Sequence, residues 1–344
     1  MRSPSDGRPR GAHLVGSIPL TDATEVFETV STVLGRHVRS VPDGETGERL
    51  VWNSWTRHSY YETPGLEVVP PPEGHYTPWD QVRLTIDPDE LVLRRLGFAD
   101  AALESYARFA RLKGEGVIPE HVRFQVCLPT PIAPMITLVE EGSRAGVEPA
   151  QTRQLFSEVE EIVAAIPHDQ LAIQWDVCLD VGIWEGAYTP WFDEPREGVV
   201  DRLVRLSEIV PTGVEMGFHL CYGDFGHKHF KEPADAGTLV EMSNAISSAV
   251  GRPVTWIHVP VPRGRVDDAY FAPFERLRLQ PATRYYLGLL HYTDGVEGAT
   301  RRLRAARTWL SGFGVATECG FGRRDPGTIE RLLRLHAEVA DPVA

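Results

Sequence analysis

The sequence predicts a single α/β domain folded as a (β/α)8 TIM barrel. Eight short apolar stretches alternate with helical stretches along the 344 residues, and strands buried on both faces of a parallel sheet show such apolar runs. Eight strand–helix units in a chain of this length fit one barrel with insertions. The main alternative is a doubly wound open sheet. No Gly-x-Gly-x-x-Gly motif opens a helix after the first strand, so a dinucleotide-binding version of that sheet is disfavoured.

The predicted elements follow one another in regular order. Expected strands cover residues 11–17, 38–41, 122–128, 171–176, 213–221, 254–259, 285–291 and 313–317. Expected helices, judged by apolar spacing, cover about residues 21–34, 100–113, 133–142, 147–166, 196–209, 233–250 and 295–310, with a last one after residue 326. We expect the barrel to occupy residues 11–344, behind a disordered N-terminus of residues 1–10.

One segment interrupts this order. Residues of about 50–87, after the second strand, are rich in aromatic residues and proline and show no clear period. We expect an insertion in the barrel, which serves either as a lid over a site or as a structured excursion.

The composition excludes several classes of partner. The formal net charge is −13, which disfavours binding to a nucleic acid or to an anionic membrane. No apolar run approaches the roughly 18–20 residues that span a bilayer, and the polar N-terminus has no signal-peptide core. We therefore expect a cytoplasmic protein with a small-molecule substrate. The four cysteines lie far apart, so core packing or metal binding is expected of them rather than disulfides.

The ends of the predicted strands carry an unusual set of side chains. Catalytic groups of a (β/α)8 barrel lie at the C-terminal ends of its strands. In strand order these ends hold Ser17, Asp43 with Glu45, Pro129, Asp176, His219 with Cys221, His258, His291 and Cys319. Seven of the eight ends thus hold a polar or metal-binding group. Packing alone does not explain this pattern, which predicts an active site at that end of the barrel.

The fifth strand contributes the most specific pair. Its period of two places His219 and Cys221 on one face, and imidazole and thiolate are preferred zinc ligands. For this pair alone, a buried cysteine beside a satisfied histidine is the plainer explanation. With His258 and Cys319, however, four groups can complete a zinc tetrahedron, and three protein ligands with one replaceable position indicate catalytic zinc. His258 is then either the fourth, displaceable ligand, or a residue that supports a ligand or contacts the substrate.

Four short motifs carry a family resemblance. Residues 219–225 resemble the His-x-Cys-Tyr-Ser-Glu-Phe motif of cobalamin-independent methionine synthase, and residues 317–324 resemble its Pro-Asp-Cys-Gly-Leu-Lys-Thr-Arg. Residues 16–19 are similar to its Gly-Ser-Phe-Pro, and residues 173–176 to its Gln-Ile-Asp-Glu-Pro. The matches occur in the right order along essentially the whole chain. They correspond to the C-terminal catalytic barrel of that family, without its N-terminal barrel.

The resemblance implies a reaction and a role for each matched residue. In that family zinc binds a thiol substrate, lowers its pKa and presents the thiolate to a methyl donor. The ligands carried over from the motifs are His219, Cys221 and Cys319. Ser17 and its backbone would hold the substrate carboxylate, Glu45 and Asp176 its amine, and His291 would be the acid near the metal. We therefore predict methyl or alkyl transfer to a zinc-activated thiol of a small amino-acid-like substrate.

Departures from the family keep a second function open. The family has a glutamate ligand where this chain has His258, and imidazole as ligand would make zinc a stronger Lewis acid, able to activate water or polarise a carbonyl. The alternative is therefore a zinc-dependent hydrolase or lyase acting on a small anionic substrate. His291, Asp176 and Asp224 are the candidates for catalytic proton transfer, and Arg324 would hold the anion. A binding protein without catalysis is a third possibility, and the oligomeric state is not predicted.

Overall fold

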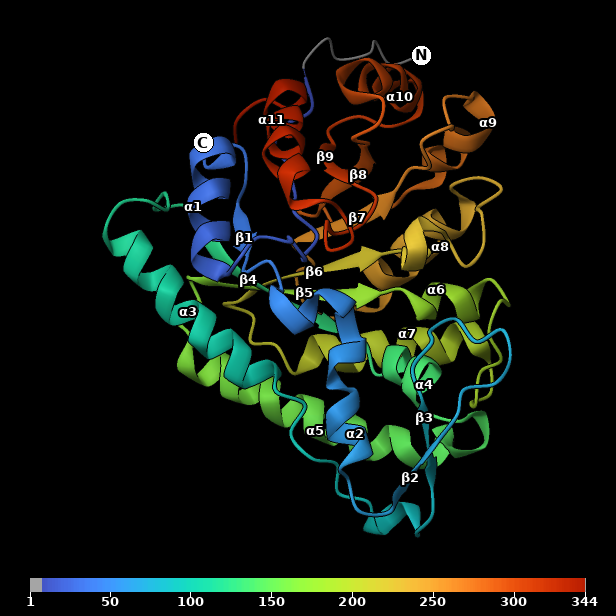
Figure 1. The fold of residues 1–344 in the computed structure, drawn as a ribbon. Coiled ribbons are helices and arrows are strands. Elements are labelled where there is room, and N and C mark those ends of the chain that lie inside the picture. Colours follow the sequence, from blue (N-terminus) through green and yellow to red (C-terminus); the bar gives the residue numbers. More distant parts are fainter. Residues whose placement is uncertain (1–7, 344) are drawn as a thin grey trace.

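The computed structural model describes residues 8–343, and it is built around a curled parallel sheet (Figure 1). Seven strands pair in the order β1-β4-β5-β6-β7-β8-β9. Their bounds are β1 Ser40–Pro42, β4 Arg123–Pro129, β5 Leu171–Val177, β6 Glu215–Leu220, β7 Trp256–Pro260, β8 Arg284–Leu290 and β9 Gly314–Thr317. All seven were predicted within a few residues, because each is a short apolar run buried on both faces.

Helices surround this sheet and connect its successive strands. They are α1 Ala23–Leu34, α3 Phe98–Gly114, α4 Ile132–Leu138, α5 Arg144–Ala165, α6 Leu179–Trp184, α7 Pro195–Glu208, α8 Gly237–Ala249, α9 Asp268–Phe271, α10 Gly295–Trp309 and α11 Ile329–Val339. Helix α1 begins directly after Asp22, whose carboxylate caps it by accepting a hydrogen bond from the backbone N–H of Glu25. Within the described part of the chain, no helix has the length and apolarity needed to cross a membrane.

The first predicted strand is only partly confirmed. Residues 11–17 are not a strand, but Ala12 forms a parallel bridge with Val315 of β9. The Ala12 N–H also donates to the carbonyl of His37, just before β1, at 2.8 Å. The segment is therefore bonded to the edge strand β9 and to the chain just before the other edge strand, β1.

The predicted disorder of residues 1–10 falls mainly outside the described residues. The described ones, 8–10, are attached to the C-terminal segment. Arg10 forms a parallel bridge with Asp341, and the Asp341 N–H donates to the Pro9 carbonyl at 2.8 Å. Residues 9 and 10 are thus tied to the chain's C-terminal segment.

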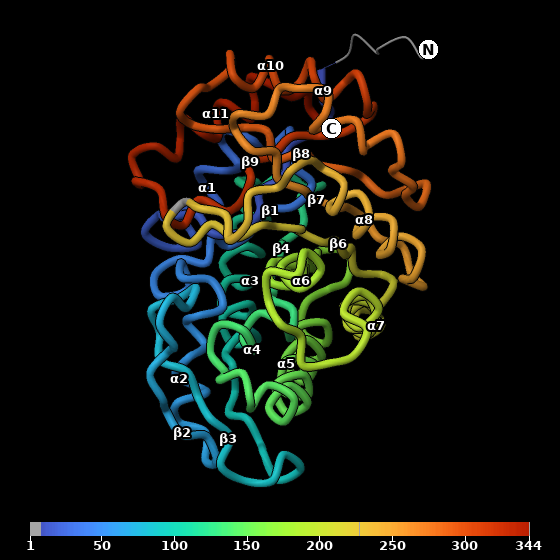
Figure 2. The backbone as a smooth tube through the Cα atoms, turned by 90° about the vertical axis from the view of Figure 1, so that its right-hand side faces the viewer, coloured from blue at the N-terminus to red at the C-terminus, as the bar shows by residue number. Residues whose placement is uncertain are grey.

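The insertion after β1 has a structure of its own. It contains the 3-10 helix η1 Gly47–Thr56, the short helix α2 Arg57–Tyr61, and an antiparallel pair, β2 Leu66–Val69 and β3 Gln81–Leu84. Figure 2 shows these elements beside α4, on the side of the molecule away from α10 and α11. A bridge from Val82 to Val139, directly after α4, fixes them there. These helices and strands are too short to give the sequence a recognisable helical or strand period.

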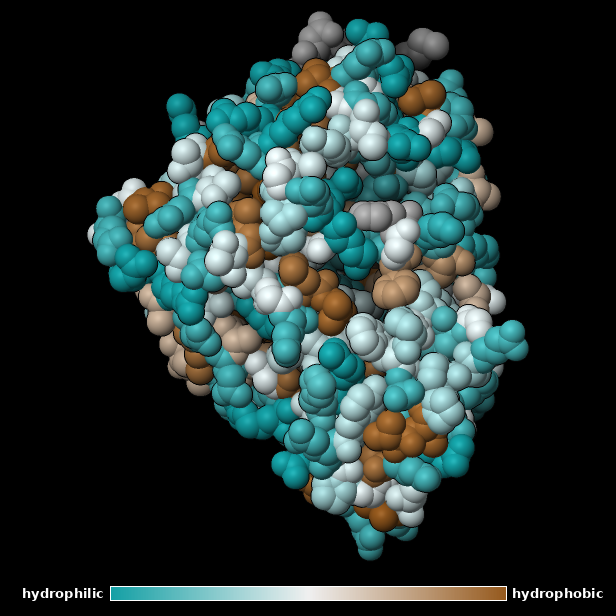
Figure 3. Space-filling model, viewed as in Figure 1, coloured by the Kyte–Doolittle hydropathy of each residue, from teal (hydrophilic) through white to brown (hydrophobic). Residues whose placement is uncertain are grey.

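The interior of the sheet combines apolar packing with a buried polar chain. His13 Nε2 lies 2.6 Å from Gln174 Oε1, and the Gln174 amide donates to Asp176 Oδ1 at 2.9 Å. Buried polar groups are tolerated when they are paired in this way. The outer face is different: Figure 3 shows mostly hydrophilic residues, with apolar ones gathered in small patches.

Gly217 of β6 is a sharp test of this packing. A Cβ atom there would lie 2.2 Å from the buried indole ring of Trp256 on β7. We expect Gly217→Ala to lower the free energy of unfolding by about 1–3 kcal/mol, because the ring must shift in a filled interior. Urea denaturation of the purified variant measures this.

Gly114→Ala is the matched control, since an added Cβ at the end of α3 meets no atom within 4 Å. This variant should be neutral or more stable by up to about 1 kcal/mol. Equal stability of the two variants would contradict the packing described for β6 and β7.

Candidate active site

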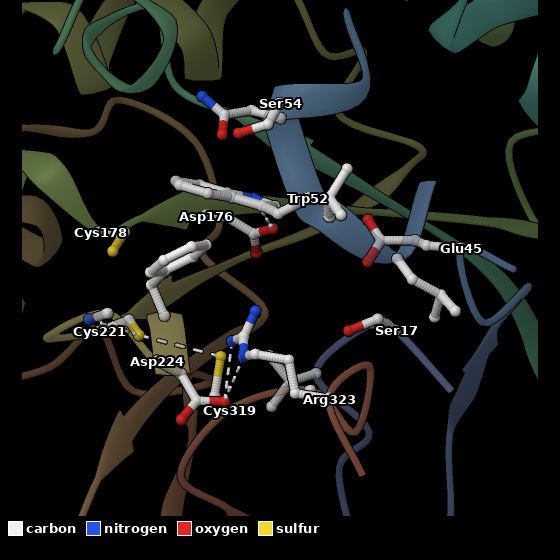
Figure 4. A pocket seen from close by; sticks show the side chains of 18 of the residues that line it. Ser17, Glu45, Trp52, Ser54, Asp176, Cys178, Cys221, Asp224, Cys319 and Arg323 are labelled. Atoms are coloured by element: carbon white, nitrogen blue, oxygen red, sulfur yellow. Dashed lines mark hydrogen bonds and ion pairs between the residues drawn. The ribbon is translucent and has the colours of Figure 1, made fainter. Parts of the chain in front are cut away.

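A pocket of about 670 Å³, including its open mouth, lies at the C-terminal ends of the strands. Its walls come mainly from the segment with Ser17, the turn after β1 together with the insertion, the ends of β5 and β6, and the loop after β9. Figure 4 shows acidic, thiol and aromatic side chains from these regions around one cavity. The position is the one at which barrels of parallel strands carry their chemistry.

Three predicted metal ligands meet at one end of this pocket. His219, Cys221 and Cys319 each offer a ligand atom, and these atoms lie within 4.8 Å of one another. The two Sγ atoms are 4.0 Å apart, and Cys319 Sγ is 3.9 Å from His219 Nε2. Ligands of a tetrahedral zinc ion stand about 3.5–4 Å apart, so the donor set fits zinc and these two separations match the spacing it needs. In addition, the Gly223 N–H donates to Cys221 Sγ at 3.1 Å.

His258 lies outside this group of three. Its Nδ1 is 2.6 Å from His219 Nδ1, and its Nε2 is 3.0 Å from the carbonyl oxygen of Thr317. Both of its ring nitrogens are thus directed at protein atoms. Burial lowers the pKa of His219 to about 3 and that of His258 well below its usual value, so both rings are neutral. A histidine binds a metal only when its ring is neutral. The ligand role of His258 stays a prediction.

Thiol and carboxyl groups beside the three ligands add to the site. Cys178, one of the four cysteines for which core packing or metal binding is expected, is buried and also lines the pocket. Its contact with Cys221, followed by burial, raises the pKa of the Cys221 thiol well above the usual range. Asp224, predicted to transfer protons, lines the mouth of the pocket and forms an ion pair with Arg323 at 2.8 Å.

Two carboxyl groups lie on another wall of the pocket: Asp176 is buried and Glu45 is half-buried. Burial raises the pKa of Asp176 to about 7, against the opposing effect of hydrogen bonds from Gln174 and Trp52. Burial and the nearby charge of Asp176 raise the pKa of Glu45 well above its usual value. A charged Asp176 thus disfavours ionisation of Glu45. Such a pair favours a cationic ligand, whose charge would allow both to ionise.

Ser17 is held in place by the loop that follows Cys319. The Phe321 N–H donates to the Ser17 carbonyl at 2.6 Å, and the Gly322 N–H donates to Ser17 Oγ at 3.3 Å. Gly320 is required here, since a Cβ atom would lie 2.4 Å from Ser17 Oγ. The predicted positions of Ser17 and Cys319 in one site are therefore consistent with the structure.

Two other predicted residues are not among those that line the pocket. Arg324 does not line it, whereas its neighbour Arg323 does. His291 is also absent from the lining: its Nε2 lies 2.9 Å from the Val261 carbonyl, and its Nδ1 lies 3.3 Å from Glu318 Oε2. Burial raises the pKa of Glu318 to about 8. His291, which is buried, thus pairs with the half-buried Glu318 next to Cys319. The catalytic role of His291 stays a prediction.

Sequence analysis offered a lid over a site as one role of the insertion, but it named no residue there. Trp52 lines the pocket and donates its indole N–H to Asp176 Oδ2 at 3.1 Å. Its φ of 54° is left-handed, which a residue with a side chain rarely adopts. Tyr76 also lines the pocket, and its hydroxyl accepts from the Phe225 N–H at 3.3 Å. The only sequence signal was the aromatic content of residues 50–87, and the insertion in fact forms a wall of the pocket.

Comparisons with known proteins place the chain by its fold. It matches no family model and no curated protein. Among solved structures it is similar to a B12-independent methionine synthase from Shewanella sp. W3-18-1 in complex with selenomethionine, at 15% identity and a TM-score of 0.61 over 96% of each chain. A putative vitamin-B12 independent methionine synthase from Listeria monocytogenes matches at 13% identity and a TM-score of 0.53, over 98% of this chain and 100% of that one.

A methyltransferase from Methanosarcina mazei gives a third match, at 13% identity and a TM-score of 0.53, over 97% of this chain and 95% of that one. At these identities the comparisons show a common fold. The resemblance predicted from four short motifs is confirmed at that level, since the methionine synthase-like fold extends over nearly the whole chain.

The contact from Trp52 to Asp176 has a measurable consequence. We expect Trp52→Phe to raise the pKa of Asp176 above about 7, because the indole N–H stabilises the carboxylate and phenylalanine has no such donor. A titration followed by carbon NMR of labelled aspartate carboxyl groups measures the shift. Trp55→Phe, in which the altered ring packs on Phe98, is the control and should leave the Asp176 pKa unchanged. A pKa that stays the same in both variants would contradict the assigned contact.

Proposed function

We propose that this protein is a zinc-dependent transferase that moves a methyl or alkyl group to a zinc-bound thiol of a small amino-acid-like substrate. One observation carries the proposal: an imidazole and two thiols lie at one end of a pocket, and two carboxyl groups, one buried and one half-buried, line the same pocket. The fold shared with methionine synthases and with a methyltransferase supports it. We further infer that residues 11–17 act as the eighth strand of a closed barrel, since they bond to the edge strand β9 and to the chain just before the other edge strand, β1.

Zinc fits the donor set of the three ligands. His219, Cys221 and Cys319 supply one nitrogen and two sulfur atoms, and three protein ligands leave a fourth position for a substrate. When bound, zinc would lower the pKa of a thiol in that position and present it as a thiolate. The N–H of Gly223 on Cys221 Sγ supports a negatively charged sulfur at this place.

The rest of the pocket suits an amino acid. Glu45 and Asp176 would hold an ammonium group, since a bound cation stabilises both carboxylates. Ser17 Oγ and the guanidinium of Arg323 line the same cavity and are suitable partners for a carboxylate. The Shewanella protein was solved with selenomethionine, an amino acid. Trp52 and Tyr76 close the insertion side of the cavity and would keep water from the thiolate.

The alternative is a zinc-dependent hydrolase or lyase for a small anionic substrate. The favouring observation is that the three clustered ligands include no carboxylate, so the open position could hold a water molecule whose pKa zinc would lower. Asp224 and the pair of His291 and Glu318 would then transfer protons. Arg323, which lines the pocket, and Arg324 beside it would bind the anionic substrate. A cytoplasmic location, and the exclusion of nucleic-acid and membrane partners, follow from composition and stay predictions.

The ligand set is tested by metal analysis. We expect about one zinc ion per purified chain, and we expect the double variant Cys221→Ser with Cys319→Ser to lose it, because serine is a poor zinc ligand. Cys127→Ser is the control. Its Sγ donates to the Val15 carbonyl at 3.2 Å and lies outside the ligand group, so this variant should keep its zinc. Full zinc content in the double variant would refute the assigned ligands.

The reaction class is tested by X-ray absorption at the zinc edge. Added L-homocysteine should raise the number of sulfur ligands from two to three, since its thiolate would enter the open position at about 2.3 Å. L-Methionine, which has the same amine and carboxylate but no thiol, should leave the count at two. A shell that does not change with homocysteine or with other small thiols would favour the hydrolase or lyase instead.

A further inference from the structure

The geometry points to a specific role for His258: it is a positioning residue that holds His219 in the one tautomer able to bind the metal. The inference rests on the zinc site proposed above, but it does not depend on which reaction that zinc serves. It assigns His258 to a hydrogen bond behind the ligand rather than to the fourth coordination position.

The contact between the two rings defines a single shared proton. Their Nδ1 atoms are 2.6 Å apart, at adjacent, paired positions of β6 and β7. Two unprotonated nitrogens at this separation would repel each other, and two N–H groups would clash. One ring must therefore donate and the other accept.

The second nitrogen of His258 decides which ring donates. Its Nε2 lies 3.0 Å from the carbonyl oxygen of Thr317, which can only accept, so His258 carries a proton on Nε2. His258 is completely buried, and a cationic imidazolium without a counter-ion is costly there. A neutral His258 with its proton on Nε2 has a lone pair on Nδ1. His219 therefore donates its Nδ1–H, and its Nε2 is left unprotonated beside the sulfur atoms.

This arrangement is the one that metal binding requires. His219 Nε2 is the ring nitrogen on the thiol side, 3.9 Å from Cys319 Sγ. A histidine ligand needs a lone pair on the nitrogen that faces the metal, and a hydrogen bond at the other nitrogen selects that tautomer. The opposite tautomer of His219 would direct an N–H at the metal position and block binding.

The packing around His258 is built for this hydrogen bond. Gly288 of β8 is its neighbour, and a Cβ atom there would lie 2.6 Å from the Thr317 oxygen and 2.9 Å from His258 Nε2. Any side chain at this position would enter the space between donor and acceptor. The carbonyl that fixes His258 belongs to the last residue of β9, two positions before the ligand Cys319. The same short segment thus fixes the tautomer and supplies a ligand.

The experiment compares zinc affinity and zinc coordination in two variants of the full chain. His258→Leu removes the acceptor for His219, and we expect zinc affinity, measured by competition with a chelator, to fall about 10- to 100-fold. X-ray absorption of the loaded variant should still show two sulfur ligands and one imidazole. His258→Asn places an amide oxygen near the Nδ1 position and should recover part of the lost affinity.

A second readout needs no metal. In the zinc-free wild-type protein labelled with nitrogen-15 histidine, NMR should show the His219 proton on Nδ1. In His258→Leu this preference should be lost. His336→Leu is the control, because it also removes a fully buried imidazole that bonds to a backbone carbonyl, but far along the chain on α11. It should change neither the zinc affinity nor the His219 tautomer.

Three results would overturn the inference: an affinity in His258→Leu equal to that of the wild type, a zinc shell that loses one nitrogen in that variant, or a His219 proton on Nε2 in the zinc-free wild type. The second would make His258 a ligand. Failure of the proposed transfer reaction with zinc and its His219 ligand intact would leave the inference standing, so the two failures are distinguishable.

Discussion

The pocket end of this sheet depends on one constraint: a polar side chain buried there is costly unless it has a hydrogen-bond partner. Two chains of contacts meet the constraint. One runs from His13 through Gln174 and Asp176 to Trp52, and the other from His219 through His258 to the end of β9. An unpaired buried polar group costs about 1–3 kcal/mol. The two chains therefore hold the Asp176 carboxyl group and His219, the proposed metal ligand, in fixed directions at the same pocket.

Most of the sheet, and half of the site, could be predicted because parallel strands leave a strong signal. Each strand from β4 to β9 is an apolar run, and its period of two shows which end residues share a face. Asp176, His219, Cys221 and Cys319 were found in this way, and all four line the pocket. The structure differs where the backbone leaves the strand. Residues 11–17 are bonded to the sheet but do not form a full ladder with it.

The residues that sequence reasoning missed lie in loops or act from behind another residue. Trp52 lies in the insertion at a left-handed backbone position, and no periodic pattern places such a side chain. Arg323 rather than Arg324 lines the pocket, a difference of one residue in a loop where alternation no longer holds. His258 lies in β7, two residues before the end of that strand, and its direction depends on the neighbouring ring and on the carbonyl of Thr317. The contacts of His258 with that ring and that carbonyl can be recognised only in the three-dimensional structure.

The position of His258 changes the electrostatic argument about the metal. With one imidazole and two thiolates as its protein ligands, zinc would have a formally neutral shell and an open position. An arriving thiolate would complete four ligands without displacing a protein group, and the shell would then be anionic. Excess negative charge on the sulfur atoms makes a bound thiolate a better nucleophile, since the metal withdraws less electron density from each of them. Placing His258 behind His219 therefore favours thiol chemistry, whereas a fourth imidazole ligand would have favoured an electrophilic metal.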